Sequence, residues 1–206
     1  DHIQGLPFFD PAYNPQKRIG IFSPHHEMKK EELKSIFELQ MQPEYFPVPL
    51  DKMGCDFHFF TSEEYQSELE MEGFVDFKYR LHNHPGGAFS YRMEAKGKSF
   101  VLCTDLEHGK DIDMEVVEFC KNADLLIHDA QFSDEKYEQC IGWGHSTITH
   151  AIKFAQLAKV KKLLFFHHDP NHNDQQLEDL TKKYLKDNPF NAEIGREGVE
   201  INLAKI

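Results

Sequence analysis

Apolar runs and helical periods alternate through the second half of the chain. Three short apolar runs have the length of buried strands: 99–104, 124–128 and 162–167. Three segments place apolar residues at helical spacing: about 112–121, about 147–159 and about 175–186. Ser146 and Thr147 are candidate caps of the middle helix, and Asp174 is the expected N-cap of the last one. This alternation predicts an α/β fold.

The first half has a less regular pattern. Prolines and a glycine interrupt residues 5–30, and apolar positions at 31–41 predict a helix that the following prolines end. Strands are predicted at 18–22, 56–60 and 74–82. The turn residues at 96–98 predict a hairpin between two further strands. We therefore expect a loop-rich first half before the regular α/β region.

Several strand-like runs end in side chains that can bind a metal ion. These endings are His82-Asn83-His84, Thr104-Asp105, His128-Asp129 and His167-His168-Asp169. In open α/β folds the C-terminal ends of strands converge on one crevice, so four such endings favour a single site. Any one of them alone is typical of an ordinary polar loop.

Composition narrows the possible chemistry. The chain has 206 residues, 13 of them histidine, and its 23 Lys and Arg against 35 Asp and Glu give a net charge of −12. Imidazole and carboxylate together favour a divalent metal centre, and a carboxylate can bridge two ions. We expect two divalent ions, zinc first and manganese or iron as alternatives, in a centre suited to hydrolysis.

The same composition argues against a protein that binds long nucleic acids, spans a membrane or depends on disulfide bonds. The acidic charge weighs against tRNA or another long nucleic acid as a substrate, because backbone binding needs clustered basic residues. No apolar run approaches the ~18 residues of a membrane span. The four cysteines lack any C-x-x-C pairing, which excludes a zinc ribbon and a disulfide scaffold and favours a cytoplasmic location.

Six ordered motifs carry a resemblance to a known family. They are 1–9, His84-Pro85-Gly86-Gly87, Cys103-Thr104-Asp105, Leu126-Ile127-His128-Asp129-Ala130, Gly144-His145-Ser146-Thr147 and Leu164-Phe165-Phe166-His167. In this order they resemble the metallo-β-lactamase superfamily, in its ribonuclease Z-like and small phosphodiesterase branch. The resemblance implies an αββα four-layer sandwich whose N-terminal strands, and the first two histidines of the H-x-H-x-D-H signature, are missing here. We expect residues 1–206 to form a single incomplete domain with a lid or insertion at about 23–73.

The resemblance also implies the roles of individual residues. The implied metal ligands are Asp1, His2, His84, Asp105 and His167. Among them Asp1, His2 and His167 would share one ion, His84 would bind the other, and Asp105 would bridge both. Asp1 could also orient the attacking hydroxide.

Two further residues are implied to be catalytic. Asp129 and His145 would form a pair in which His145 assists at the scissile phosphate, beside a helix start that favours anions. Three alternatives stay open. His82 shares a strand face with His84, and His168 neighbours His167, so a different register would make either one the ligand or place it behind the ligand. His145 could also be a capping or packed residue. We expect His128 to point away from Asp129, and the other histidines, His25, His26, His58, His108, His150 and His172, to be surface or packing residues.

The leading functional hypothesis is a dinuclear metal-dependent hydrolase. A hydroxide held between two ions would attack a small cyclic or nucleotide-type phosphodiester, an anionic substrate. One rival is hydrolysis of a carboxylic ester, thioester or lactone on the same metal core. The other is a binding module that kept the fold without catalysis. The Pro- and Phe-rich segment at 23–73 could serve as a substrate lid or as the contact of a homodimer, with a small satellite core as an equal alternative.

Overall fold

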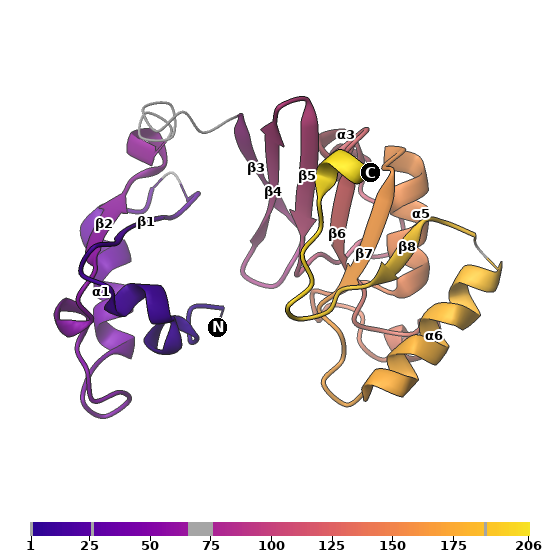
Figure 1. Ribbon diagram of the computed structural model, residues 1–206. Coiled ribbons are helices and arrows are strands. Elements are labelled where there is room, and N and C mark those ends of the chain that lie inside the picture. The colour runs from indigo at the N-terminus through magenta and orange to yellow at the C-terminus, as the bar shows by residue number, and fades with distance from the viewer. Residues whose placement is uncertain (1, 26, 66–75, 188) are drawn as a thin grey trace. The chain divides into compact units, whose positions relative to one another are not determined.

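The structure is a computed structural model that describes residues 2–25, 27–65, 76–187 and 189–206 (Figure 1). The chain divides into two compact units, residues 1–74 and 75–206. Each unit is described by itself. A single domain with an insertion at about 23–73 stays a prediction.

The first unit contains a small parallel sheet and one long helix. Strand β1 (Arg18–Phe22) pairs in parallel with β2 (Asp56–Phe60), and α1 (Lys30–Gln40) supplies buried apolar residues to the same core. The unit also contains three 3-10 turns: Leu6–Phe8, Asp10–Tyr13 and Leu50–Lys52. Its buried core comprises Ala12, Leu33, Phe37, Met41, Leu50 and Met53.

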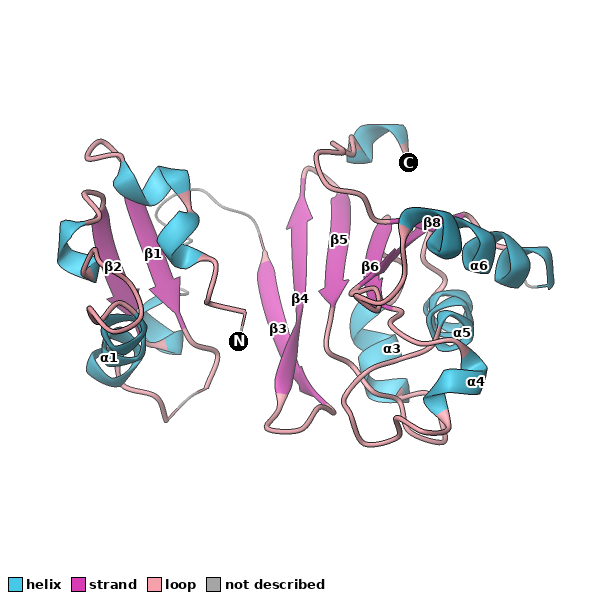
Figure 2. Ribbon diagram, turned by 90° about the horizontal axis from the view of Figure 1, so that it is seen from below, coloured by secondary structure: helices cyan, strands magenta, loops and turns pink. Residues whose placement is uncertain are grey.

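The second unit contains a six-stranded sheet with the order β3-β4-β5-β6-β7-β8. The strands are β3 (Phe77–His82), β4 (Ala88–Ala95), β5 (Lys98–Cys103), β6 (Leu125–Asp129), β7 (Lys162–Phe166) and β8 (Ala192–Ile194). The β3-β4 and β4-β5 pairs are antiparallel, whereas β5 through β8 run parallel. Because β4 runs opposite to both neighbours, β3 points the same way as β5, β6 and β7. The C-terminal ends of these four strands therefore lie at one edge of the sheet (Figure 2).

One buried core joins the helices of this unit to the sheet. It contains residues of α3 (Met114–Cys120), α5 (Ile148–Ala158) and α6 (Asp174–Asp187) together with alternate residues of β5, β6 and β7. Two short helical segments complete the described elements: α4 (Asp134–Tyr137) and η4 (Leu203–Lys205). The alternation of the strands places Leu126 on this side and Ile127 on the opposite face.

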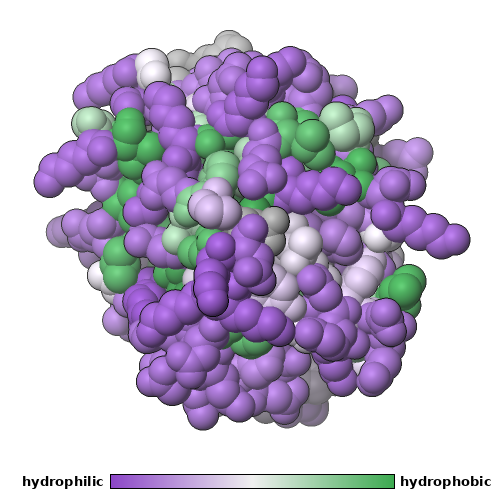
Figure 3. Space-filling model, turned by 90° about the vertical axis from the view of Figure 1, so that its right-hand side faces the viewer, coloured by the Kyte–Doolittle hydropathy of each residue, from purple (hydrophilic) through white to green (hydrophobic). Residues whose placement is uncertain are grey.

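The opposite face of the sheet is partly covered by the chain's C-terminal segment. Val199, Ile201 and Leu203 line a cavity of about 410 Å³ together with Ile127 and Leu164. This cavity is apolar and is lined by different residues from those of the candidate metal centre. On the side of the molecule seen in Figure 3, hydrophilic residues cover most of the surface and hydrophobic ones form small separate groups.

The α/β fold and the main elements predicted from the sequence are confirmed. The hairpin turn at 96–98 joins β4 to β5, and Thr147 caps α5 by accepting the amide of His150. The expected cap of α6 is wrong: Asp174 is its first residue, and Asn173 accepts the backbone N–H of Gln176. Asn173 also donates its own amide to Gln176, and this reciprocal pair explains why the helix begins one residue earlier than predicted. Among the described helices, none is both long enough and apolar enough to cross a bilayer.

Candidate metal centre

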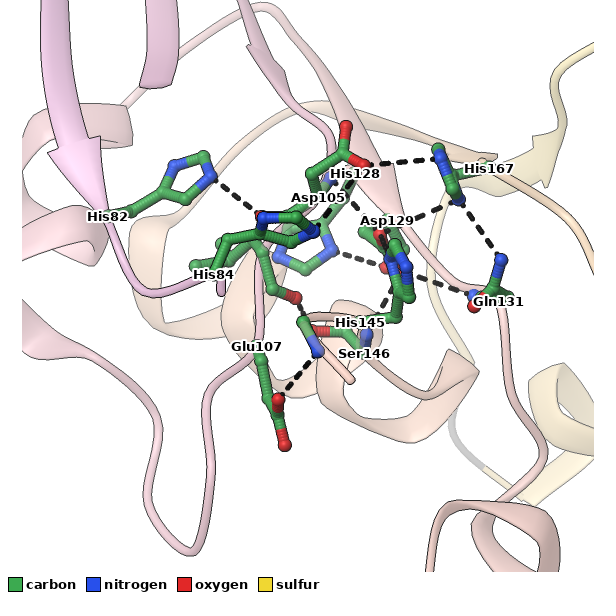
Figure 4. A network of polar contacts seen from close by, with 12 residues as sticks. His82, His84, Asp105, Glu107, His128, Asp129, Gln131, His145, Ser146 and His167 are labelled. Carbon is green, nitrogen blue, oxygen red and sulfur yellow. Dashed lines mark hydrogen bonds and ion pairs between the residues drawn. The ribbon is translucent and has the colours of Figure 1, made fainter. Parts of the chain in front are cut away.

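The strand ends at one edge of the sheet bring together side chains that are far apart in the sequence. His84 follows β3, Asp105 follows β5, Asp129 ends β6, and His167 follows β7 (Figure 4). His145 joins them from the loop before α5. All five belong to the second unit, and their side chains lie between fully buried and about one quarter exposed.

The Asp105 carboxylate lies between two histidines. Its Oδ1 atom is 3.3 Å from Nε2 of His167 and 3.9 Å from Nε2 of His84. The hydrogen bond with Asp105 raises the pKa of His167 above its ordinary value, since the carboxylate favours the charged imidazole. On the other side of the His167 ring, Gln131 Nε2 is 3.3 Å from Nδ1.

Two of these residues have an uncommon backbone conformation. Asp105 has a φ of 57° and His167 a φ of 56°, both in the left-handed region. Non-glycine residues adopt it at an energetic cost, so the surrounding structure must hold them there. His167 directly follows β7 and Asp105 lies two residues after the end of β5, so in each case the unusual conformation occurs where the chain leaves the sheet.

Asp129 is a fully buried carboxylate that organises the neighbouring loops. Its Oδ2 accepts the amide of Asp105 at 3.1 Å and lies 2.8 Å from Nδ1 of His145. Its Oδ1 accepts the amides of Gln131 at 3.2 Å and Ser146 at 3.0 Å. These contacts, three backbone amides and one imidazole, satisfy both carboxylate oxygens. They also require Nδ1 of His145 to carry the hydrogen, which leaves Nε2 for an ion or a substrate.

The His145 ring is enclosed by aromatic neighbours. It stacks on His167 with a centroid distance of 4.6 Å and an interplanar angle of 20°. It meets His84 edge-on at 5.6 Å and Phe132 edge-on at 6.0 Å. The ring therefore lies within the histidine cluster and does not merely cap the following helix.

The donor geometry fits divalent metal ions. Ligand atoms of His84, Asp105 and His145 all lie within 4.8 Å of one another, and so do those of Asp129, His145 and His167. Two donors on one tetrahedral ion with bonds of about 2.1 Å lie roughly 3.4 Å apart, close to the separation of Asp105 from His167. The mixture of imidazole and carboxylate donors suits zinc and related ions.

Comparison with protein-family models identifies the superfamily of the chain. The family model described as "Beta-lactamase superfamily domain" matches residues 1–168. The chain belongs to the β-lactamase superfamily. That match spans β1 to β7, the candidate ligands and the His145 loop, and it confirms the resemblance drawn from the six sequence motifs.

Relatives within the superfamily include ribonuclease Z enzymes. Ribonuclease Z of Prochlorococcus marinus is 41% identical over 80 residues, which are 39% of this chain and 24% of that relative. Ribonuclease Z of Halalkalibacterium halodurans is 38% identical over 88 residues, 43% of this chain and 27% of that relative. The chain thus matches about a quarter of the length of these curated relatives.

Solved structures agree on the fold. The metallo-β-lactamase fold protein YhfI from Bacillus subtilis gives a TM-score of 0.64 at 17% identity and covers 97% of this chain and 71% of that one. The short form of human tRNase Z gives 0.59 at 20% identity, with 97% and 73% covered. A diphosphatase of the PhnP family gives 0.55 at 15% identity, with 98% and 64% covered. At these identities the likeness shows the metallo-β-lactamase fold alone.

Two of the sequence-predicted ligands belong to the first unit. Asp1 lies outside the described residues, so its roles as ligand and as catalytic residue stay predictions. His2 is described and exposed, and its role as a ligand also stays a prediction. His84 and His167 both lie within 4 Å of the Asp105 carboxylate, and the roles of these three residues as ligands also stay predictions.

His82 and His168, the sequence neighbours of two predicted ligands, lie in different surroundings. His82 is buried, with Nδ1 2.8 Å from Ser90 Oγ and Nε2 3.0 Å from the Asp105 carbonyl, and burial lowers its pKa. Both of its ring nitrogens are therefore occupied, which favours His84 over His82 as the ligand. His168 lines a separate cavity with Asp174 and Arg196.

Sequence reasoning missed one buried acid beside the centre. Glu107 is 3% exposed, and its carboxylate accepts the amides of Gly142 at 2.7 Å and Gly144 at 2.8 Å. It also accepts the hydroxyl of Tyr137 at 3.0 Å, and burial with the nearby carboxylate raises the pKa of Tyr137 to about 12. A charged residue in an irregular segment has no sequence pattern that predicts such a role. The one sequence feature that places Glu107 near the centre is its position two residues after Asp105.

Proposed function

We propose that this chain acts as a metal-dependent phosphodiesterase on a small cyclic or nucleotide-type phosphodiester. The observation that carries the proposal is the pair of buried Asp129 and partly buried His145, with 2.8 Å between Oδ2 and Nδ1, beside the donors of the candidate metal centre. A hydrolase of lactams or acyl esters does not need a second acid–histidine pair of this kind. Phosphodiester cleavage does benefit from a group that protonates the leaving oxygen.

Each residue of the site has a distinct role in the proposed reaction. His84, Asp105 and His167 would hold divalent ions, which supply Lewis acidity and a nucleophile at neutral pH when bound. Asp129 holds the His145 ring in one orientation through Nδ1. Nε2 of His145 then exchanges a proton with a phosphoryl or leaving oxygen. The amide groups at the start of α5 favour an anion nearby.

The relatives add a second candidate substrate. The aligned proteins from Prochlorococcus and Halalkalibacterium are ribonuclease Z enzymes, and one structural neighbour is a tRNase Z. These names weigh against excluding long RNA on net charge alone. A tRNA therefore belongs in the substrate test beside the small diesters.

A substrate panel tests the proposal. The protein, loaded with zinc or manganese, is assayed on bis(p-nitrophenyl) phosphate, a cyclic nucleotide, a tRNA, p-nitrophenyl acetate and a lactone. We expect metal-dependent cleavage of the small phosphodiesters and little turnover of the acyl esters. Preference for the acyl esters would assign the centre to carboxylic ester chemistry. Exclusive cleavage of the RNA would assign it to RNA processing, and no turnover of any substrate would favour a binding module.

A further inference from the structure

An exposed tryptophan lies next to the candidate catalytic histidine. Trp143 is the only tryptophan of the chain and is 61% exposed, two residues before His145. Single exposed apolar residues are common on protein surfaces and need no function. Trp143 differs from such residues because the loop around it is anchored by buried hydrogen bonds.

The backbone on both sides of Trp143 is anchored to a buried carboxylate. Glu107 accepts the amides of Gly142 and Gly144, the two neighbours of Trp143. The amide of Trp143 itself donates to the Cys140 carbonyl at 3.0 Å. A carboxylate that is 3% exposed and satisfied by backbone amides fixes the loop, because breaking these bonds would leave a buried charge without partners. The indole is therefore displayed on a firmly held segment.

The two glycines beside Trp143 differ in the space around them. Gly142 and Gly144 have φ values of +88° and +96°, which side chains rarely adopt. A Cβ added at Gly144 would collide with His84, whereas one added at Gly142 would meet nothing within 4 Å. Trp143 follows this open glycine and is itself 61% exposed. A flat ring can reach an indole presented in this way.

One buried ring connects the indole to the catalytic pair. Phe132 is 4% exposed, and its ring lies 6.4 Å from that of Trp143 and 6.0 Å from that of His145, edge-on to both. Its backbone is bonded to the same loop, since its amide donates to the Ser146 carbonyl at 3.1 Å. The rings of Trp143 and His145 are therefore both packed against the same buried ring.

We propose that Trp143 is a stacking surface for the nucleobase of a nucleotide-type substrate whose phosphodiester lies at His145. This inference rests on the proposed function and specifies its substrate class. Nucleobases stack on exposed aromatic side chains, and this contact is tolerant of sequence because every base has a π face. A base held at Trp143 would orient the attached phosphodiester toward His145 without any basic side chain.

Intrinsic fluorescence tests the stacking without relying on turnover. Since Trp143 is the only tryptophan, the emission of the metal-loaded protein reports on this residue alone. We expect adenosine 5′-monophosphate to quench it saturably and ribose 5-phosphate, which lacks the base, to leave it unchanged. N-acetyltryptophanamide controls for absorption by the nucleotide and for collisional quenching. The absence of saturable quenching, or equal quenching by ribose 5-phosphate, would overturn the proposal.

A second experiment compares the kinetics of two phosphodiesters that differ in whether they carry a nucleobase. Thymidine 5′-(p-nitrophenyl phosphate) carries a base, whereas methyl p-nitrophenyl phosphate releases the same product without one. We expect Trp143→Ala to raise KM for the thymidine ester roughly 5- to 100-fold and to leave the methyl ester unchanged. Trp143→Phe, which keeps a π face, should restore most of the loss. Ile141→Ala, at a 64% exposed apolar residue of the same loop, is the matched control and should change neither.

The outcomes separate this inference from the proposed function. Base-dependent quenching without hydrolysis of any phosphodiester would keep the stacking site and remove the proposed activity. Hydrolysis with equal KM changes for both esters would keep the activity and remove the stacking site. An emission shift that follows protein concentration in the absence of nucleotide would place Trp143 in a contact between copies and overturn the proposal.

Discussion

Glu107 and Gly144 form a backbone anchor beside the candidate metal centre. Oε2 of Glu107 accepts the Gly144 amide at 2.8 Å, and this bond holds Gly144 against the imidazole of His84. A Cβ at Gly144 would lie 2.6 Å from Nε2 of His84 and 2.7 Å from Cδ of Pro85. The bond therefore sets the spacing between the loop that carries His145 and a predicted metal ligand.

Gly144→Ala should disturb the metal centre. The added methyl group needs the space of the His84 ring, so we expect His84 to move and metal affinity to fall by 10-fold or more. Metal titration by calorimetry measures the change. Gly142→Ala is the matched control, because its φ is equally strained but its Cβ would meet nothing within 4 Å. Equal losses in both variants would show that backbone strain alone is responsible.

Glu107→Gln should loosen the His145 loop. The amide can offer one acceptor oxygen where the carboxylate uses two, so either Gly142 or Gly144 would lose its bond. We expect kcat on a phosphodiester to fall about 10- to 100-fold with little change in KM, and faster hydrogen exchange at the two glycine amides. Glu138→Gln, at an exposed acid of the same region, should behave like the wild type. Unchanged exchange at both amides would contradict the anchoring role.

Much of the site could be predicted because strand ends obey a simple rule. Asp105, Asp129 and His167 each end or directly follow an apolar run, and β5, β6 and β7 are parallel neighbours. Their side chains must then meet at one edge of the sheet. His84 was also found in this way, since β3 points in the same direction.

The residues that sequence reasoning missed depend on tertiary contacts. Glu107 is a charged residue in an irregular segment, and charged residues are usually exposed. Only the folded chain brings it to the amides of Gly142 and Gly144, 35 and 37 positions away. The short elements were missed for another reason: β8 (Ala192–Ile194) and α4 (Asp134–Tyr137) span too few residues for a periodic pattern to show.

A buried histidine pair should make the fold sensitive to acid. The Asp113 amide donates to Nδ1 of His108, and Nδ1 of His128 contacts the Asp129 carbonyl at 2.6 Å. His108 must then donate through Nε2 to Nε2 of His128 at 3.2 Å, which requires both rings to be neutral. Burial lowers the pKa of His128 to about 4 and, together with His128, that of His108 to about 2.

The unfolded chain binds more protons than the folded one between these values and about 6.5, the pKa of free histidine. The free energy of unfolding should therefore fall as the pH is lowered from 6.5 to 4, on the order of 1 kcal/mol per pH unit for each histidine. Urea unfolding with a chelator present at pH 7, 6 and 5 measures the slope. His108→Gln should reduce the slope of the free energy of unfolding against pH by the amount that corresponds to about one proton. His172→Gln, at a partly exposed residue, should leave the slope unchanged. Equal slopes in wild type and His108→Gln would contradict the assignment.

His145→Ala separates the two roles that the geometry allows for this residue. If Nε2 of His145 exchanges a proton with the substrate, kcat on bis(p-nitrophenyl) phosphate should fall about 10²- to 10⁴-fold while the bound metal stays constant. Asp129→Asn should give a similar loss, because an amide cannot accept all the donors that now converge on the Asp129 carboxylate. Metal analysis of both variants accompanies the kinetics. Loss of metal in His145→Ala would assign His145 to the ligand set with His84 and Asp105, and full activity with intact metal would remove it from the mechanism.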